Sequence, residues 1–478
     1  MRNLITFYLN GERHTVPSEH STSMLADYLR YVRGLTGTKI VCAEGDCGAC
    51  TVLRNFPYGE NSEQFLTVNS CIIPLISLDG SHILTIESLK DGDRLHESQR
   101  AMMECHGSQC GFCTPGFVMA YAALCDQKKM NDEKTISEKE CKNATTGNLC
   151  RCTGYKDIIN AGTNIDVAKE KSLIERFHTK DVVKELRQII SESLMIEKEN
   201  LKLFAPVSLA EALVYLKNNS DVRIVGFGTD LGVVHNKRKI ELSKILSLHL
   251  INELYENKLE KNKVYIGART TISELRQLLK DKCNEFVSYL DIFASPQIKN
   301  GATLIGNIAN ASPIGDTPPV MLVLNAKVHL KSVHNIRTVE IDKFFLDYRK
   351  INREQDELIV GIEFDLPSEE EKLIFRKTSL RKDLDISTLN LALRWKIKDD
   401  VIENIKIAAG GIAKTPLRLH KMEQYLIGKM PTESNIEQAL AIGHQEFKPI
   451  SDVRSTASYR RVVFSHLIKR NLNQEVNI

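Results

Sequence analysis

Eight of the twelve cysteines fall into two groups of four within the first 152 residues, and their spacing constrains the fold more than any other feature. The first group follows the pattern Cys-x4-Cys-x2-Cys, with a fourth cysteine after 20 further residues, and consists of Cys42, Cys47, Cys50 and Cys71. The second group consists of two close pairs, Cys110 with Cys113 and Cys150 with Cys152. In a reducing compartment, clustered cysteines favour metal binding over disulfides.

The first group has the spacing of a plant-type [2Fe–2S] site, in which three sulfurs come from one tight loop and one from a separate segment. Gly45, Gly48 and Ala49 lie in this loop. Small residues suit such a loop because its backbone N–H groups must turn inward toward the cluster's sulfurs. A structural zinc ion is the alternative to the cluster, but zinc sites usually pair two short cysteine knuckles. The spacing therefore favours a [2Fe–2S] cluster.

The second group is ambiguous by itself, because two cysteine pairs also suit zinc. The Cys-x-Cys pair is tighter than a usual zinc knuckle. Each pair also adjoins a predicted helix: Thr114-Pro115 begins one, and Thr153-Gly154-Tyr155 leads into the other. Helix N-termini facing a cluster of net negative charge would stabilise its reduced form. Isolated cysteines are usually small buried residues, so no role is assigned to Cys105, Cys125, Cys141 or Cys283.

Length and composition indicate a multidomain globular protein. A chain of 478 residues suggests three or four domains, and 42% hydrophobic with 26% charged residues allows sizeable cores. The net charge of +3 gives no reason to expect a nucleic acid or membrane partner. We find no signal peptide at the N-terminus and no run of about 18 apolar residues. We therefore expect a cytoplasmic protein.

Turn signals and periodicity predict the N-terminal elements. Apolar stretches at 4–9 and 13–16 flank Asn10-Gly11, a strong hairpin signal. Helical spacing of Leu25, Leu29 and Val32 predicts a short helix, and residues 64–88 predict two strands around Asp79-Gly80. Residues 95–165 indicate helices interrupted by the second cysteine group, with Pro115 in the first turn of one helix. Residues 166–200 are predicted to be a linker with some helix.

The rest of the chain indicates α+β structure. Residues 201–375 alternate short β-branched runs with Gly, Asn and Pro turns. Beyond Pro367 we expect strands at 374–378 and 405–411 and helices at 434–446 and 452–470. The domain boundaries expected from these patterns and from the resemblance described below are 1–88, 89–166, a linker at 167–197, 198–372 and 373–478.

Two segments of the middle domain have features of a nucleotide cradle. Residues 224–232 (IVGFGTDLG) form a strand that ends in a small-residue turn, which could present N–H groups to a diphosphate. Leu231 departs from the G-x-G-x-x-G spacing, and an ordinary turn is the competing interpretation. Residues 301–316 (GATLIGNIANASPIGD) combine small and short polar residues that could surround a polar ligand, although a structural turn would also explain them.

The motifs GTKIVCAEGDCGACTV, GSQCGFCTPGFVM and GNLCRCTGY resemble the two iron–sulfur domains of molybdenum hydroxylases. The order of iron–sulfur, flavin and short C-terminal parts in one chain resembles the small subunit of the xanthine dehydrogenase branch. Residues 408–418 (AAGGIAKTPLR) are similar to its C-terminal domain. The resemblance implies an α+β multidomain protein. It would consist of a β-grasp ferredoxin-like domain, a helical [2Fe–2S] domain, an FAD domain of the vanillyl-alcohol-oxidase type and a small C-terminal α+β domain.

The resemblance also implies roles for individual residues. The first four cysteines would hold the cluster nearer the flavin, and the second four the cluster nearer a molybdenum cofactor. Phe293 would stack near the adenine of FAD, Asp316 would bond its ribityl or ribose region, and Lys377 would lie near the isoalloxazine. Further FAD contacts are expected at Val225, Gly226, Phe227, Gly228, Thr229, Asp230, Leu231, Ala302, Thr303, Ile305, Gly306, Asn307, Asn310 and Val360.

Some residues depart from the family pattern. Phe227 interrupts what is often a run of glycines, Ile305 replaces a usual glycine, and Ile40-Val41 stand where Glu-Gly is common. None of these departures removes a metal ligand. The charged run Lys382–Asp385 is interpreted as a solvated turn, with a loop near the flavin as the alternative.

The resemblance implies an NAD⁺-dependent oxidoreductase subunit with no residue for hydroxylation on this chain. A large molybdopterin-binding partner, in an α2β2 assembly, would hydroxylate hypoxanthine or xanthine and deliver electrons through the clusters to FAD. The alternatives are a stand-alone NADH-dependent reductase, a subunit of another molybdenum hydroxylase acting on aldehydes or N-heterocycles, and a structural zinc protein.

Overall fold

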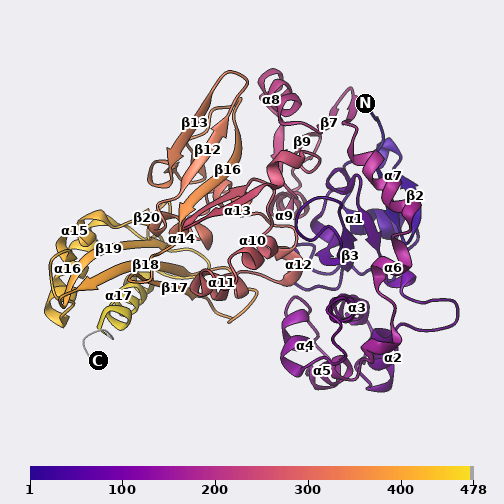
Figure 1. The fold of residues 1–478 in the computed structure, drawn as a ribbon, viewed down its shortest axis with the longest axis horizontal. Coiled ribbons are helices and arrows are strands. Elements are labelled where there is room, and N and C mark those ends of the chain that lie inside the picture. Colours follow the sequence, from indigo (N-terminus) through magenta and orange to yellow (C-terminus); the bar gives the residue numbers. More distant parts are fainter. Residues whose placement is uncertain (474–478) are drawn as a thin grey trace. The chain divides into compact units, whose positions relative to one another are not determined.

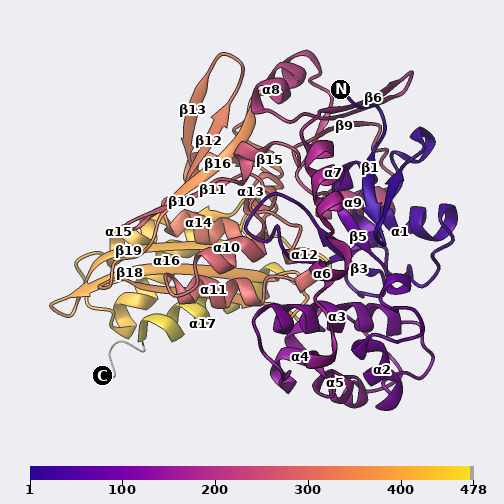
Figure 2. The same ribbon diagram turned by 45° about the vertical axis from the view of Figure 1, so that its right-hand side comes forward.

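The computed structural model describes residues 1–473, which divide into two compact units. Unit 1 comprises Met1–Tyr255 together with Thr271–Glu274 and Ala294–Ala302. Unit 2 comprises Glu256–Thr270, Leu275–Phe293 and the chain from Thr303 onward. Figures 1 and 2 show the ribbon from two directions, coloured along the sequence.

Unit 1 begins with a mixed five-stranded sheet in the order β2-β1-β5-β3-β4. Its strands are β1 (Thr6–Leu9), β2 (Glu12–Thr15), β3 (Thr51–Asn55), β4 (Leu66–Asn69) and β5 (His82–Leu84). Strand β1 pairs with β2 in antiparallel fashion and with β5 in parallel. Asn10 and Gly11 both have positive φ, at 54° and 89°, as a two-residue type I′ turn requires. The predicted hairpin is therefore confirmed.

The other N-terminal predictions are confirmed with changed detail. The short helix is α1 (Leu25–Asp27), which continues as a π-helical turn over Tyr28–Val32. The two strands expected within 64–88 are β4 and β5, but they are not hairpin partners because β3 lies between them in the sheet. Two 3-10 helices, Ser70–Ile72 and Leu75–Leu78, occupy the connection.

Four helices follow and carry the second cysteine group. They are α2 (Glu97–Glu104), α3 (Thr114–Met130), α4 (Glu138–Ala144) and α5 (Lys156–Thr163), and they lie together in Figures 1 and 2. Pro115 stands in the first turn of α3, as predicted. Ser137 and Glu140 form a reciprocal capping box that fixes the start of α4.

The segment expected to be a linker is mostly folded. It contains a 3-10 helix (Val167–Lys169), α6 (Leu173–Phe177) and α7 (Lys180–Ile190), and β6 (Leu194–Lys198) begins within it. Several of its apolar side chains are buried, including Leu186 and Ile190. The predicted helix is present, but these buried side chains make the segment part of unit 1 and not a free linker.

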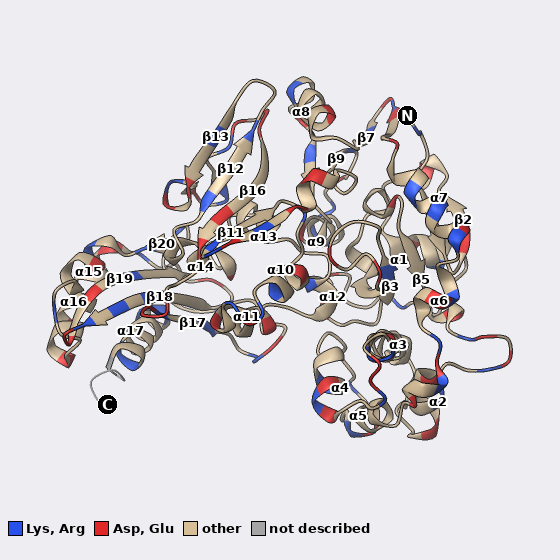
Figure 3. Ribbon diagram, viewed as in Figure 1, with Lys and Arg blue, Asp and Glu red and all other residues tan. Residues whose placement is uncertain are grey.

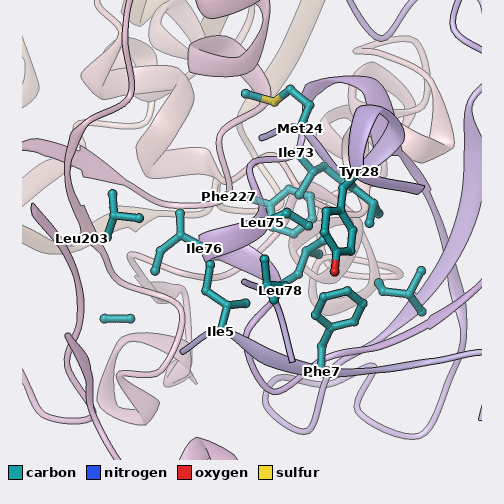
Figure 4. Close-up of a cluster of buried hydrophobic side chains, with 14 of the residues drawn as sticks. Ile5, Phe7, Met24, Tyr28, Ile73, Leu75, Ile76, Leu78, Leu203 and Phe227 are labelled. Carbon is teal, nitrogen blue, oxygen red and sulfur yellow. The ribbon is translucent and has the colours of Figure 1, made fainter. Parts of the chain in front are cut away.

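A second sheet of unit 1 shares a core with the first. It has the order β6-β7-β9-β8, with β7 (Leu201–Ala205), β8 (Arg223–Val225) and β9 (Lys244–Ser247), accompanied by α8 (Leu209–Asn218) and α9 (Thr229–Arg238). One buried cluster joins Ile5, Phe7 and Leu78 from the first sheet region to Leu203 and Phe227 from the second. Figure 4 shows these side chains among those of the cluster. Two regions far apart in sequence therefore form one hydrophobic core.

Unit 2 contains two larger sheets and a small hairpin. Their orders are β10-β11-β16-β12-β13, β14-β15 and β17-β18-β19-β20. The strands are β10 (Asn257–Glu260), β11 (Lys263–Gly267), β12 (Lys327–Lys331), β13 (Ile336–Glu340), β14 (Phe345–Asp347), β15 (Lys350–Ile351), β16 (Leu358–Asp365), β17 (Lys372–Thr378), β18 (Leu389–Lys398), β19 (Val401–Gly410) and β20 (Leu417–Arg418). The remaining helices, of which α12 lies in unit 1 and α10 begins there, are α10 (Ile272–Leu278), α11 (Asn284–Asp291), α12 (Pro296–Lys299), α13 (Leu304–Ala309), α14 (Thr317–Val323), α15 (His420–Leu426), α16 (Glu433–Glu446) and α17 (Ala457–Asn473).

The C-terminal predictions agree with the structure except for one strand and one boundary. Strands β17 and β19 and helix α16 are confirmed, and α17 begins at Ala457 rather than at residue 452. Strand β18 was not predicted. Its first seven residues are all buried, because the sheet has helices such as α14 and α17 packed against β18. A strand buried on both faces lacks the alternation that marks a half-exposed strand.

Charges of both signs are interspersed along the ribbon, as Figure 3 shows. Within residues 1–473, no helix is both long enough and apolar enough to cross a membrane.

The buried His82 and the partly buried His178 stack in unit 1. The rings of His82 and His178 lie 5.3 Å apart between centroids at an interplanar angle of 11°. The Nε2 atom of His82 accepts a hydrogen bond from the Gly11 amide at 3.1 Å. Burial, and secondarily the neighbouring His178, lowers the pKa of His82 to about 3, and burial lowers the pKa of His178 to about 4.

This pair predicts a loss of stability in mild acid. Both imidazoles stay neutral in the folded state, whereas an unfolded histidine gains a proton near pH 6.5, so acid favours unfolding between about pH 6.5 and 3. At pH 5.5, His82 should contribute a loss of about 1.3 kcal/mol relative to pH 7. Urea unfolding at pH 7 and 5.5 measures this loss.

The variant His178→Phe keeps a stacked ring and removes one titrating group, so its free energy of unfolding should depend less on pH. His466→Phe, at an exposed position of α17, is the matched control and should behave like the parent. An unchanged pH dependence in His178→Phe would contradict the assignment.

Candidate functional site

The first four cysteines gather at one place in unit 1. Cys42, Cys47 and Cys50 lie in the loop before β3, and Cys71 lies in the 3-10 helix Ser70–Ile72. Hydrogen bonds with the thiols of Cys47 and Cys71 lower the pKa of Cys42, and Cys50 bonds Cys71 in the same way. The spacing-based prediction that these four residues converge is confirmed.

The loop backbone turns toward the sulfur atoms. The amides of Glu44 and Cys47 both donate to the Cys42 Sγ at 3.5 Å. Gly45 and Gly48 have φ values of 76° and 67°, in the left-handed region that suits glycine. The buried Asn69 side chain donates to the Gly45 carbonyl at 2.5 Å and holds the loop against β4. This is the arrangement expected of a loop that supplies N–H groups to a cluster's sulfurs.

The second four cysteines also converge, at the N-termini of two helices. The sulfurs of Cys110 and Cys152 lie 3.4 Å apart, and Cys113 bonds Cys150. Cys113 is the N-cap residue of α3, and α5 begins at residue 156, a few positions beyond Cys152. The helix N-termini predicted beside this group are therefore present, and they favour negative charge there.

The two cysteine loops touch at the level of the backbone. A Cβ atom on Gly48 would lie 2.2 Å from the Gly147 carbonyl oxygen, and one on Gly116 would lie 2.3 Å from the Gly48 carbonyl oxygen. The Leu149 amide donates to the Cys47 carbonyl at 3.0 Å. A single hydrogen bond thus joins a cysteine of the first group to the residue that precedes Cys150.

The donor sets fit two iron–sulfur clusters. All twelve cysteines are free thiols, and no group of His, Cys, Asp or Glu in residues 1–473 is arranged around a single metal ion. Each quartet offers four thiolate ligands with backbone or hydroxyl donors nearby, as a [2Fe–2S] cluster requires. The Thr153 hydroxyl, for example, lies 3.1 Å from the Cys150 Sγ. Of the cysteines given no role, Cys125, Cys141 and Cys283 are buried and Cys105 is partly buried.

The first glycine motif lies beside the first cysteine group. Val225 ends β8, and Gly228, with φ of 100°, is the N-cap of α9. Phe227 is only 3% exposed and packs in the shared core, whereas Asp230 is exposed on the first turn of α9. Gly226, Thr229 and Leu231 are partly exposed. The predicted residues 225–231 therefore form a strand-to-helix turn.

Helix α9 is tied directly to the cysteine loop. The Asn236 side chain donates to the Ala43 carbonyl at 2.9 Å and to the Cys71 carbonyl at 2.8 Å. A Cβ on Gly232 would lie 2.0 Å from the Ile72 carbonyl oxygen, so the helix backbone approaches this segment closely. Neither contact was predicted, because each pairs residues more than 150 positions apart.

The second glycine-rich segment mostly forms α13 and its flanks. Ala302 belongs to unit 1, and Thr303 onward belongs to unit 2. The Thr303 hydroxyl caps α13 by accepting from the Gly306 amide at 2.9 Å. The Asn307 side chain accepts from the Thr317 hydroxyl at 2.7 Å. Ile305 is buried, Asn310 is partly exposed, and Val360 lies on β16.

Asp316 and Lys377, predicted near different parts of a flavin, form a buried ion pair in unit 2. The Lys377 Nζ lies 2.8 Å from the Asp316 Oδ2, and their side chains are 1% and 9% exposed. The same ammonium donates to the Ile292 carbonyl at 3.3 Å and to the Phe293 carbonyl at 3.1 Å. The structure therefore brings Phe293, Asp316 and Lys377 together.

Two further residues complete this network and were not predicted. The Ser387 hydroxyl donates to the Asp316 Oδ1 at 2.5 Å, and the Asn390 side chain donates to the Gly315 carbonyl at 2.9 Å. The Gly410 amide donates to the Asn390 Oδ1 at 2.8 Å. No local pattern marks Ser387 or Asn390, since their partners Asp316 and Gly315 lie more than 70 residues away. The run Lys382–Asp385 lies in a turn in which Lys382 is exposed.

Family models match the chain in four consecutive segments. Residues 7–75 match a 2Fe-2S iron–sulfur cluster binding domain, and residues 85–163 match a [2Fe-2S] binding domain. Residues 199–367 match the FAD binding domain in molybdopterin dehydrogenase, and residues 374–474 match the CO dehydrogenase flavoprotein C-terminal domain. The chain belongs to the molybdenum hydroxylase family.

Relatives in this family are much longer than the chain. Xanthine dehydrogenase 1 of Arabidopsis thaliana is 30% identical over 509 residues, covering 91% of this chain and 37% of that protein. Xanthine dehydrogenase of Drosophila pseudoobscura pseudoobscura is 30% identical over 499 residues, covering 91% and 36%. The chain thus spans little more than a third of the length of these relatives.

Solved structures share the fold of more than half of the chain. A carbon monoxide dehydrogenase from Hydrogenophaga pseudoflava, which lacks the Mo-pyranopterin moiety, matches with a TM-score of 0.55 and 25% identity over 58% of this chain and 98% of that one. Quinoline 2-oxidoreductase from Pseudomonas putida 86, at 22% identity and a TM-score of 0.52, covers 56% of this chain and 94% of that one and shows the fold alone.

The family membership confirms the cofactor classes and the fold class. The chain has two [2Fe–2S] domains and an FAD-binding domain, in an α+β multidomain architecture. The domain boundaries and the roles of individual residues remain predictions.

The Lys377–Asp316 pair generates a stability prediction. Lys377→Met leaves the Asp316 carboxylate buried without its cation, which should lower the free energy of unfolding of unit 2 by about 3 to 5 kcal/mol. The double variant Lys377→Met with Asp316→Asn should lose less, because neither charge is left alone. Urea unfolding of the four proteins in this cycle measures the coupling.

Lys382→Met is the matched control, since its side chain is exposed. Additive losses in the double variant would show that the two charges do not depend on each other.

Proposed function

We propose that the chain is the electron-transfer subunit of a xanthine dehydrogenase. It would receive electrons from a molybdopterin-binding partner that hydroxylates hypoxanthine or xanthine, and deliver them through two clusters and FAD to NAD⁺. The observation that carries this proposal is a series of contacts in unit 1 that runs from the second cysteine group to the first and on to α9. The Leu149 amide, next to Cys150, donates to the Cys47 carbonyl, and the Asn236 side chain of α9 donates to the loop of the first group. The relatives at 30% identity support the substrate class.

The cysteines would act as the cluster ligands. Cys42, Cys47, Cys50 and Cys71 would hold one cluster, and Cys110, Cys113, Cys150 and Cys152 the other. Bound clusters would carry one electron at a time, whereas bound flavin would collect two electrons and could pass them on as a hydride. The chain's own contribution is to hold the thiolates, aim backbone amides at the sulfurs and bring the two loops into contact.

The residues expected to contact the flavin occur in both units, and each set is considered within its own unit. In unit 1, the turn at 225–231 would carry the diphosphate on backbone N–H groups, and Ala302 of the second glycine-rich segment would be a further contact. In unit 2, Thr303, Ile305, Gly306, Asn307 and Asn310 would line the ligand with Val360. Phe293, Asp316 and Lys377 would contact the adenine, ribityl and isoalloxazine regions, and Ser387 and Asn390 would fix the Asp316 region.

The second cysteine group would face the partner. Cys110 and Cys152 are exposed, and an apolar side chain from each loop is exposed beside them, with Phe112 at 50% and Leu149 at 37%. Aromatic and apolar residues at an accessible cluster suit a docked protein subunit. We propose a cytoplasmic α2β2 assembly with a large molybdopterin-binding chain.

A second candidate is the corresponding subunit of another molybdenum hydroxylase, acting on aldehydes or N-heterocycles. The match of residues 374–474 to the CO dehydrogenase flavoprotein model favours keeping this candidate. A stand-alone NADH-dependent reductase is the third possibility, in which the cluster beside Cys110 would serve a different acceptor.

Purification of the tagged chain from its host tests these alternatives. The proposed function requires about four irons and one FAD per chain, a co-purified molybdenum-containing subunit and xanthine-dependent reduction of NAD⁺. Activity with an aldehyde or N-heterocycle in place of xanthine would support the second candidate. Clusters and NADH oxidation without a molybdenum subunit would support the third, and zinc without flavin would exclude all three.

Single cysteine changes should remove one cluster at a time. Cys47→Ser and Cys150→Ser should each lower iron and acid-labile sulfide by about half, because each removes one ligand from a different quartet. EPR spectra of the reduced proteins should lose different signals in the two variants. Cys283→Ser, at a buried cysteine outside both groups, should keep both signals. Loss of the same signal in both variants would contradict the two-site assignment.

The exposed apolar side chains beside the second cysteine group, Phe112 and Leu149, should be required for assembly with the molybdenum subunit. Phe112→Asp places a charge in the proposed interface and should reduce co-purification of the molybdenum subunit by on the order of tenfold, as loss of an aromatic interface contact does. Both clusters and FAD should remain. Ile336→Asp is the control, since Ile336 is 68% exposed on β13, far along the chain from the cysteines. Equal assembly of both variants would move the interface elsewhere.

A further inference from the structure

Three buried polar side chains surround the point where the two cysteine loops touch. They are Thr51, Asn148 and Gln297, at 2%, 3% and 1% exposure. Thr51 follows Cys50 directly, and Asn148 lies two residues before Cys150. Gln297 comes from α12, a short helix that the family match assigns to the FAD-binding part but that belongs to unit 1.

These side chains form one hydrogen-bonded cluster. The Gln297 Nε2 donates to the Asn148 Oδ1 at 2.9 Å and to the Thr51 Oγ1 at 3.2 Å. The Asn148 Nδ2 donates to the Gly48 carbonyl at 3.1 Å. The cluster therefore ties the Cys47–Gly48 backbone to the backbone that leads through Leu149 to Cys150.

Gln297 is seated by its own helix. The Ser295 hydroxyl caps α12 and Pro296 occupies its first turn, which fixes the direction of a four-residue helix. A Cβ on Gly147 would lie 1.9 Å from the Gln297 Oε1, so the amide packs flat against the glycine backbone. That oxygen is buried without a hydrogen-bond partner among the described residues. A buried amide left partly unpaired is unfavourable, which argues against Gln297 as a mere space filler.

We propose that Gln297 is a positioning residue for electron transfer between the two cysteine groups, acting through Asn148 and Thr51 on the Leu149–Cys47 hydrogen bond. This inference rests on the proposed function, because it requires a cluster on each group. In the step, one electron leaves one cluster, which is oxidised, and reaches the other, which is reduced, and no proton or bond is exchanged. The hydrogen bonds of Gln297 go to Thr51 and Asn148 and not to a cysteine sulfur. Its effect would therefore be on the contact between the two loops and not on the cluster ligands.

The test uses Gln297→Met, which keeps the length of the side chain and removes both donated hydrogen bonds. The purified full-length chain with its clusters and FAD is reduced by one electron with a deazaflavin flash. Freeze-quench EPR then follows the redistribution of that electron between the two cluster signals. We expect the rate of redistribution to fall on the order of tenfold, since small misplacements of reacting groups slow reactions to this extent or more.

The midpoint potentials and EPR line shapes of both clusters should stay at the parent values, which a general structural disturbance would shift. Asn300→Leu is the matched control, because Asn300 ends the same helix and donates to the Thr67 carbonyl without touching either cysteine loop. If Gln297→Met does not fold, Thr51→Val removes the hydroxyl that accepts from Gln297 and should slow redistribution in the same direction.

Unchanged redistribution in Gln297→Met or Thr51→Val would overturn the inference, as would shifted potentials that account for a slower rate. Parent protein that contains no clusters would instead refute the proposed function, so the two failures are distinguishable.

Discussion

The contact between two glycine-lined cysteine loops is the constraint on which the rest of unit 1 depends. At Gly48, Gly116 and Gly147 the chain approaches itself more closely than any side chain would permit. That approach allows the Leu149 amide to reach the Cys47 carbonyl. The ferredoxin-like sheet and the four-helix part are therefore joined through the loops that carry their cysteines, and not only through their apolar surfaces.

Part of the segment that matches the FAD-binding domain also belongs to unit 1, where its side chains share a buried core with the first sheet. Leu203 and Phe227 complete the core around Ile5 and Phe7, and Asn236 fixes α9 on the first cysteine loop. Rigid elements hold a functional group more reproducibly than loops do, because packing limits their alternatives. In unit 2, the charge pair of Asp316 and Lys377 plays the comparable role of organising strands β17 and β18 around one buried point.

The features that the sequence predicted are those set by local spacing. Cysteine intervals revealed both quartets, Asn10-Gly11 revealed a hairpin, and Pro115 revealed the start of α3. The features it did not reveal depend on distant partners. Strand β18 has no alternation because both faces are buried. Gln297, Ser387 and Asn390 bond residues that lie 70 or more positions away. The segment 166–200 was underestimated for a related reason, since its helices gain order from packing against earlier residues.

The shared core has a consequence for how the protein is made. Apolar side chains next to the first sheet, such as Leu78, are not fully covered until Leu203 to Leu250 have been synthesised. At ordinary translation rates, the interval between the synthesis of Leu78 and that of Leu250 lasts roughly 10 to 35 s. The first cysteine loop is complete before it begins, while the sheet behind the loop still exposes an apolar face. Until that interval ends, the nascent chain carries an exposed apolar surface of the kind that makes folding intermediates prone to aggregate.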